Sequence, residues 1–293
     1  MGIIEINKLT KYYGEIRGIK SLDLSVNEGE FFGFIGPNGA GKSTTIRTLL
    51  GLIHPTSGKA EIFGKDIRKN NTGILSDIGY MPSEAMFYNG MKVKDVIKLS
   101  AKLRKKECSK EALKLCERLS LDTEKLVDEL SLGNRKKVSV VCAMQHKPRL
   151  YILDEPTSGL DPLMQKEFFD ILKERHNEGA TIFLSSHILS EIQKNCSRAA
   201  IIKEGEIIVL DSVENLSKTN AKRVILRGIK KLPDAISSKS VETSEDGISF
   251  LYNGDIKQLI NIINSLPVTD LTITEPQLDE IFMHYYEKGG EAK

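Results

Sequence analysis

The chain of 293 residues has no apolar run approaching the roughly 18 residues expected of a membrane-spanning helix, so the sequence predicts none. Its first residues, Met1 to Glu5, lack the charged and apolar regions of a signal peptide. None of its four cysteines stands in a C-x-x-C pair. This spacing favours reduced thiols in a cytosolic protein over disulfides or a zinc site.

Charge of one sign is also lacking, because 42 basic and 40 acidic residues give a net charge of only +2. So small an excess does not predict a nucleic-acid partner, and we expect none. The basic runs 104–106 and 135–137 are short and lie in helical patterns, which favours solvated faces. With 40% apolar residues, the composition is that of a globular protein large enough for one large or two modest domains.

The most specific pattern is the glycine-rich segment 36–44, which matches G-x-x-x-x-G-K-[ST]. It follows a strand-like apolar run, 31–35, and precedes apolar residues at helical spacing. In such a loop backbone N–H groups cradle phosphates, Lys42 reaches the β- and γ-phosphates, and the Ser43 hydroxyl ligates Mg²⁺. The sequence therefore predicts a nucleoside triphosphate site with Mg²⁺. Its expected contacts are Gly36, Pro37, Asn38, Gly39, Ala40, Gly41, Lys42, Ser43 and Thr44.

A second nucleotide signal is the apolar run 150–153, which leads into Asp154 and Glu155. A carboxylate at the end of a strand suits the hydration shell of Mg²⁺, and we assign that role to Asp154. Glu155 is our candidate catalytic base, which would orient or deprotonate the attacking water. A strand followed by a solvated acidic turn is the alternative, and it is disfavoured by the preceding phosphate-binding loop.

The order of predicted elements indicates two domains. Residues up to about 80 are strand-rich, a helical region covers about 85–145, and a strand–helix rhythm then returns up to 211. A Ser-, Lys- and Asn-rich stretch at 212–221 predicts a linker. Beyond it, 222–293 reads as a small α+β domain. Its expected elements are strands at 223–229, 247–252 and 268–274 and helices at 255–265 and 277–286.

Three further segments follow in order: 130–134 (LSLGN), 158–161 (SGLD) and 185–187 (SSH). Together with the two signals above, they resemble the ATP-binding-cassette (ABC) ATPases over residues 3–211. The resemblance implies an α/β P-loop NTPase core, with an antiparallel β subdomain, a helical subdomain and here a small C-terminal α+β accessory domain. The chain is most similar to the bacterial drug- and antibiotic-peptide-export subgroup, to which the tail 278–282 adds a weaker match.

The resemblance assigns roles to further residues. Tyr13 matches the aromatic that stacks on adenine, with Tyr12 packing outward, and His187 matches the histidine that senses the γ-phosphate. Asp161 would cap a helix and lie near the dimer seam. The signature residues Ser131, Leu132, Gly133 and Asn134 would contact ATP bound to the other subunit. Alternatively, 130–131 could simply cap a helix, which we place at 135–144.

Two departures from the family pattern stand out. Ser83 occupies the position of the family's Q-loop glutamine, and although its hydroxyl can bind a metal-coordinated water, it is too short to span the same distance. In the signature, Leu132 replaces the first glycine and Asn134 replaces glutamine. Coupling to a partner is therefore expected to differ, whereas ATP hydrolysis should survive.

The resemblance implies an ATPase subunit that powers export of a small molecule or peptide through a separate membrane-spanning permease. It would act as a homodimer or with a paralogous cassette, at the cytoplasmic face of the membrane. Apolar residues 86–88 are either a permease contact or a local core cluster. Two alternatives remain: a cytosolic ATPase acting on ribosomes or DNA, and a nucleotide-gated regulator with little turnover. The sequence identifies neither the substrate nor the direction of transport.

Overall fold

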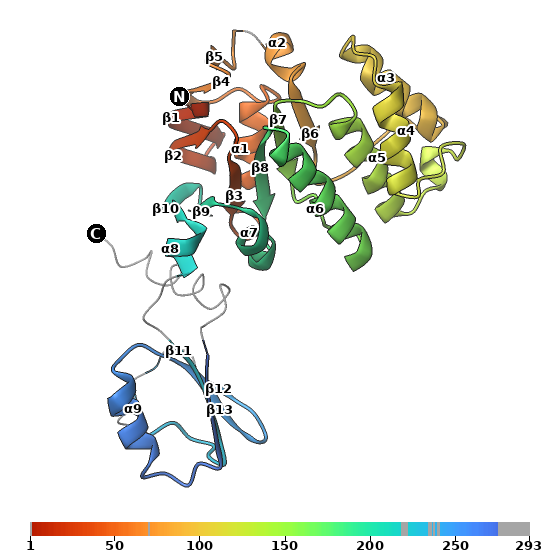
Figure 1. Ribbon diagram of the computed structural model, residues 1–293. Helices are drawn as coiled ribbons and strands as arrows, with labels where there is room; N and C mark the ends of the chain where they lie inside the picture. Colours follow the sequence, from red (N-terminus) through yellow and green to blue (C-terminus); the bar gives the residue numbers. More distant parts are fainter. Residues whose placement is uncertain are drawn as a thin grey trace. The chain divides into compact units, whose positions relative to one another are not determined.

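The structure, a computed structural model, describes residues 2–69, 71–217, 222–233, 236, 238 and 241–274. The predicted final helix 277–286 and the tail motif 278–282 lie outside the described residues. The chain forms two compact units, Met1–Val213 and Glu214–Lys293, which are described separately (Figure 1). The division falls inside the stretch predicted as a linker.

An antiparallel sheet forms the start of the first unit. Its strand order is β2-β1-β4-β5, with β1 at Gly2–Tyr13, β2 at Ile16–Asn27, β4 at Ser57–Ile62 and β5 at Lys65–Asp66. Ile4 of β1 pairs with Val26 on one side and Ile62 on the other, and all three side chains are buried. The strand-rich character predicted for residues up to about 80 is therefore confirmed for these strands.

The second sheet has the order β10-β9-β3-β8-β7-β6 and is parallel except for its edge strand β10. Its strands are β3 (Phe31–Ile35), β6 (Ile78–Met81), β7 (Leu150–Asp154), β8 (Thr181–Ser186), β9 (Arg198–Lys203) and β10 (Glu206–Ser212). Because five strands run in parallel, the residues that follow β3, β6, β7 and β8 emerge at one edge. A tight turn at 204–205 joins β9 to β10, with both residues at positive φ.

Alternate residues of β3 face two different layers. Phe32 and Phe34 belong to the main apolar cluster, together with Ile46 of helix α1 (Lys42–Leu49). On the other face, a Cβ added at Gly33 would lie 2.6 Å from Ile192 of helix α7 (Leu189–Asn195). Only glycine lets that helix approach so closely, which fixes one layer of helix against the sheet.

Helices occupy most of the region predicted as helical, about 85–145, from Val93 onward (Figure 1). It contains α3 (Val93–Leu103), α4 (Ser109–Arg118), the 3₁₀ turn η1 (Val127–Glu129) and α5 (Leu132–Met144). The start predicted for the last helix, residue 135, is wrong by one turn. Ser131 is already its N-cap, and its side chain accepts a hydrogen bond from the Asn134 backbone N–H (3.3 Å). The short helix α2 (Asn71–Leu75) and the longer α6 (Pro162–Asn177) complete the unit.

The second unit has its own antiparallel sheet, in the order β12-β13-β11-β14, with helix α9 (Ile256–Ile263). The strands are β11 (Lys222–Arg227), β12 (Val241–Thr243), β13 (Gly247–Tyr252) and β14 (Asp270–Thr274); helix α8 (Val213–Ser217) spans the unit boundary. Leu259 of α9 packs with Val224 and Phe250 in a separate core. The strand β12 was missed, because its three residues are all exposed and carry no apolar alternation.

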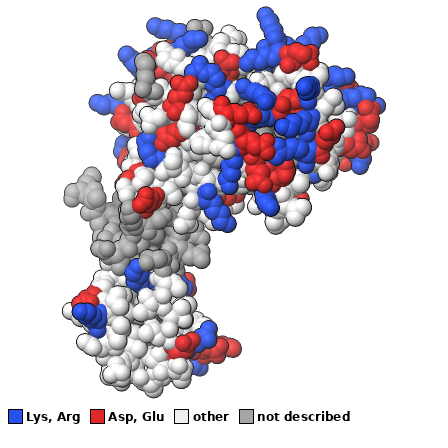
Figure 2. Space-filling model, in the orientation of Figure 1, with Lys and Arg blue, Asp and Glu red and all other residues white. Residues whose placement is uncertain are grey.

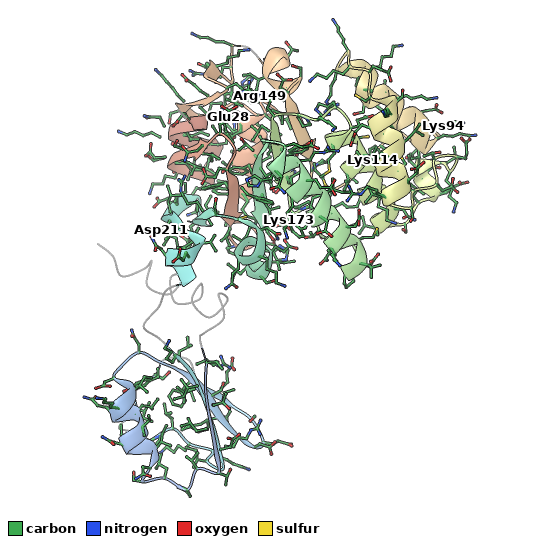
Figure 3. All side chains as sticks on the ribbon, in the orientation of Figure 1. Glu28, Lys94, Lys114, Arg149, Lys173 and Asp211 are labelled. Carbon is green, nitrogen blue, oxygen red and sulfur yellow. The ribbon has the colours of Figure 1, made fainter. Side chains whose placement is uncertain are left out.

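The surface of the first unit mixes both signs of charge on the face shown in Figure 2. One labelled pair in Figure 3, Arg149 and Glu28, is joined at 2.6 Å between Nη2 and Oε1. Such exposed pairs contribute little to stability. Among the described residues, no helix combines the length and the apolar character needed to cross a bilayer.

Candidate nucleotide-binding site

The loop between β3 and α1 has the backbone that its glycines require. Gly39 and Gly41 have φ values of 80° and 110°, which favour glycine. A Cβ at Gly36 would lie 2.5 Å from the Ile202 carbonyl oxygen, and one at Gly41 would lie 2.8 Å from the Gly18 carbonyl oxygen. The loop can therefore curl tightly over the end of the sheet and present the N-terminus of α1, a position suited to an anion.

Lys42 is buried at the first position of α1, with 4% of its surface exposed. Its Nζ donates to the carbonyl oxygens of Gly36 (2.6 Å) and Pro37 (3.1 Å). It also lies 3.1 Å from the Oε1 atom of Glu155. The ammonium is thus held beneath the loop, directed toward the place where the acids of β7 emerge.

A cavity of about 270 Å³ lies against this loop. Tyr13 lines it from the end of β1 and is 45% exposed, whereas Tyr12 is half-buried. The aromatic chosen from the sequence therefore borders the loop cavity. Sequence reasoning missed three other lining residues, at positions 16–18 of β2. The signal for them is strand pairing, because Tyr13 pairs with Ile16 across the hairpin.

Asp154 ends β7 and is almost fully buried. Its Oδ1 accepts a hydrogen bond from the Ser185 hydroxyl (3.1 Å), while Oδ2 is buried and has no hydrogen-bond partner among the described residues. Burial raises the pKa of the carboxyl, and the hydroxyls of Ser43 and Ser185 oppose that rise. A buried carboxylate oxygen left over beside a serine hydroxyl fits a hard cation such as Mg²⁺.

These two side chains would leave most Mg²⁺ positions to phosphate and water oxygens, as is usual for this ion. The described residues contain no cluster of three His, Cys, Asp or Glu side chains that could hold a metal ion. Ser83, the third candidate for a metal contact, lies in the loop after β6 and is half-buried. Its backbone carbonyl accepts a hydrogen bond from Lys136.

Glu155 connects the phosphate-binding loop to His187. Its Oε1 lies 3.1 Å from Lys42 Nζ, and its Oε2 lies 3.2 Å from His187 Nδ1. The residue has φ of 48° and donates its backbone N–H to the Ser185 carbonyl oxygen (3.0 Å). Burial raises the pKa of Glu155, but Lys42 and His187 together lower it further, so the pKa lies below its ordinary value. The carboxylate form, which a base requires, is therefore favoured.

The signature residues lie outside that cavity. Ser131 is exposed, as is 58% of Leu132, and neither lines the cavity against Lys42. A Cβ at Gly133 would approach the Gly159 carbonyl oxygen at 3.1 Å, and one at Gly159 would approach Leu132 Cδ2 at the same distance. The first turn of α5 is thus packed on the turn that precedes α6.

Asp161 caps α6 as the sequence predicted. Its Oδ1 accepts hydrogen bonds from the backbone N–H groups of Leu163 and Met164, both at 3.0 Å, and Pro162 follows at the first helical position. The residue is exposed and stands two positions after Gly159. Ser131 to Asn134 and Asp161 therefore share one neighbourhood, separate from the phosphate-binding loop.

Comparison with protein families gives a match described as "ABC transporter" over residues 19–158. The chain is 36% identical to the bacitracin transport ATP-binding protein BcrA of Bacillus licheniformis, covering 96% of each chain. It is 31% identical to the probable multidrug ABC transporter ATP-binding protein YbhF of Escherichia coli, covering 75% of this chain and 39% of that protein.

Solved structures show the same fold. A structure described as the ATP-binding subunit of an ABC transporter has 28% identity and a TM-score of 0.69, covering 73% of this chain and 91% of its own. A second, cbiO1 of Clostridium perfringens, has 25% identity and a TM-score of 0.61, covering 73% and 90%. Its description makes it part of the ABC transporter complex cbiONQ.

Proposed function

The chain belongs to the ABC transporter ATP-binding proteins and is an ATPase of that family, and from this premise we propose that it powers an exporter whose membrane-spanning part is a separate chain. The geometry around Lys42 and Glu155 supports the ATP-hydrolysis part of this proposal most directly. The carboxylate lies 3.1 Å from the loop lysine and is kept ionised by its surroundings.

In the proposed mechanism, the loop 36–44 and Lys42 bind the phosphates of ATP, and Tyr13 stacks on adenine. Ser43 and Asp154 would hold Mg²⁺, which supplies charge neutralisation at the phosphates when bound. Glu155 accepts the proton of the attacking water, and its hydrogen bond with His187 fixes the direction of its second oxygen. His187 is 46% exposed, so it can turn toward the terminal phosphate.

A second cassette completes the site in this proposal. Ser131 and the N-terminus of α5 are exposed and lie apart from the cavity against Lys42, so they can act on a nucleotide only in another chain. Each ATP would then lie between two subunits, and hydrolysis would weaken their association by removing contacts to the γ-phosphate. The second cassette is a copy of this chain or a paralogue.

The permease contact is proposed at the loop after Ser83. Met86 is 83% exposed and Tyr88 is 77% exposed, so these residues are not the local core cluster that the sequence also allowed. Exposed apolar side chains of this size suit a protein partner. Through this contact the chain would be bound to the cytoplasmic face of a bacterial membrane. The described presence of cbiO1 in a transporter complex supports such pairing.

The substrate class is proposed from the relatives. One is named for bacitracin transport and matches over 96% of this chain, and another is named as a probable multidrug transporter. We therefore propose a peptide antibiotic or a drug-like molecule as cargo. Bacitracin is the first substrate to test, since the relative that carries its name aligns along nearly the whole chain.

The test combines turnover with transport. The purified chain should hydrolyse ATP, and Lys42→Ala should abolish nucleotide binding. Expressed in a sensitive bacterium together with a candidate multi-span permease, the chain should raise resistance to bacitracin, and the Lys42→Ala form should not. Co-purification of the two proteins checks the pairing directly. ATP hydrolysis without co-purification, but with sedimentation on ribosomes, would reject export in favour of a cytosolic role.

A further inference from the structure

Lys136 is a buried lysine that the nucleotide contacts do not explain. It stands in α5, two residues after Asn134, and only 1% of its surface is exposed. Removing an ammonium from water is unfavourable unless polar groups surround it. Its burial therefore indicates specific partners.

Those partners are two consecutive backbone carbonyls. Lys136 Nζ donates to the carbonyl oxygen of Pro82 at 3.3 Å and to that of Ser83. Both belong to the segment that leaves β6, which ends at Met81. Within the described residues, no carboxylate lies at ion-pair distance from this ammonium. The lysine thus holds the main chain of the loop and does not depend on the side chain at position 83.

Three acids surround the lysine at longer range. Burial lowers the pKa of Lys136, while the charges of Asp154, Glu155 and Glu84 raise it, and the pKa lies below its ordinary value. Asp154 and Glu155 come from the end of β7, and Glu84 comes from the loop itself. The ammonium is therefore placed where helix α5, the loop after β6 and the end of β7 meet.

The serine at position 83 has a short side chain that ends in a single hydroxyl. Such a side chain cannot link its loop to groups several ångströms away, so the loop needs another connection to the rest of the site. The contact from α5 is such a connection, because it fixes two successive peptide groups from a rigid helix.

We propose that Lys136 is a positioning residue whose hydrogen bonds hold the loop 82–88 to helix α5, so that the loop and the helix move together. The inference rests on the proposed function, in which this loop meets the permease. A shift of α5 on engaging a second cassette would then displace the exposed Met86 and Tyr88 directly. The connection would not require a side chain at position 83 to contact the metal or the nucleotide.

Hydrogen–deuterium exchange of the full chain without nucleotide tests this tether. Lys136→Met keeps an unbranched side chain, shorter by one heavy atom, and removes both hydrogen bonds. Amides in 83–88 should then exchange at least about tenfold faster, the factor expected for loss of a charge-assisted hydrogen bond. Lys137→Met, on the same helix and half-buried, is the matched control and should leave that segment unchanged.

Turnover gives a second readout that a purely structural residue would not move in the same way. Lys136→Met should lower kcat about tenfold and leave KM for ATP within about twofold, because the cavity residues are untouched. Lys136→Arg keeps the charge and should restore most of both the protection and kcat. Should the methionine variant not fold, Lys136→Gln, which can serve one carbonyl, should show intermediate exchange.

Unchanged exchange in 83–88 for Lys136→Met would overturn the proposal, as would equal acceleration in Lys137→Met. A raised KM with an unaltered kcat would overturn it too, since that result places the lysine in nucleotide binding. If the parent chain hydrolysed no ATP, the proposed function would fail, while the exchange experiment would still decide whether the tether exists.

Discussion

Replacing Glu155 by glutamine removes one negative charge from between Lys42 and His187 and nearly preserves the shape of the side chain. In the parent, the two carboxylate oxygens lie 3.1 Å from Lys42 Nζ and 3.2 Å from His187 Nδ1. The amide can still accept from one of these groups with its oxygen. It can no longer accept a proton from water, so the change separates binding from chemistry.

The catalytic loss follows from the role of a general base. Such a group contributes about 10²–10⁴-fold to a rate, so kcat for Glu155→Gln should fall by about that factor. The side chain is 19% exposed and held in the carboxylate form by its neighbours. No other carboxylate within the described residues lies at ion-pair distance from Lys42, so we expect no replacement base at this position.

The affinity for ATP should rise in Glu155→Gln, although kcat falls. The ammonium of Lys42 is neutralised in part by Glu155, and a triphosphate competes with that carboxylate for the same charge. Removing the competitor should strengthen ATP binding by about 1–2 kcal/mol, or about five- to thirtyfold. The carbonyl oxygens of Gly36 and Pro37 still orient the ammonium, so its position should be retained.

Single-turnover phosphate release measures the first effect, and calorimetric titration with ATP measures the second. Glu28→Gln is the control, since it breaks an exposed ion pair with Arg149 (2.6 Å) remote from the cavity and should alter neither quantity. A rate for Glu155→Gln within about tenfold of the parent would refute the assignment of Glu155 as the base. Weakened ATP binding would refute the competition for Lys42.

Three further predictions concern the phosphate-binding loop and two buried charged or titratable side chains of the first unit. Gly41→Ala places a Cβ 2.8 Å from a backbone oxygen at φ 110°, so it should lower the free energy of unfolding by about 1–3 kcal/mol and abolish most ATP binding. Gly39→Ala, at φ 80° in open space, should lower the free energy of unfolding by only about 1 kcal/mol, and urea denaturation measures both values. Arg175→Met removes a guanidinium that is 2% exposed and paired with Glu111, and should lower the free energy of unfolding by about 3 kcal/mol, so an unchanged urea midpoint would contradict this account. Burial lowers the pKa of His146 from 6.5 to about 4, so on acidification the unfolded chain binds a proton before the folded chain does. The free energy of unfolding should therefore fall by about 3 kcal/mol as the pH drops from 6.5 to 4. His146→Gln should lose less stability over this pH range, which urea midpoints measured at both pH values would show.

Local signals in the sequence predict many of the strands and helices that position the site. The strand 31–35, the helix beginning at Lys42 and the cap at Asp161 could be predicted because each depends on residues within a few positions of itself. The parallel order of the strands then gathers Asp154, Glu155 and His187 at one edge. That order followed from the family resemblance rather than from periodicity.

Contacts between distant segments could not be read from the sequence. Residues 16–18 enter the cavity only through strand pairing with β1, and Lys136 meets Ser83 across 53 positions. The pattern of charges suggested a solvated face for 135–137, yet Lys136 is buried. The start of α5 was also missed, since Gly133 and Asn134 have low helix propensity and Ser131 decides the boundary.

The two exposed leucines beside the signature argue further for a second cassette. Leu132 is 58% exposed and lies against Gly159, and Leu163, on the first turn of α6, is 76% exposed. Apolar side chains of this kind, next to the uncovered N-terminus of α5, suit a partner that is both apolar and anionic. A nucleotide held in the cavity of another cassette offers both properties, since phosphate meets the helix and protein surrounds it. We infer that Leu132 replaces the smaller residue of the family pattern as a contact across that junction, beside the exposed Ser131.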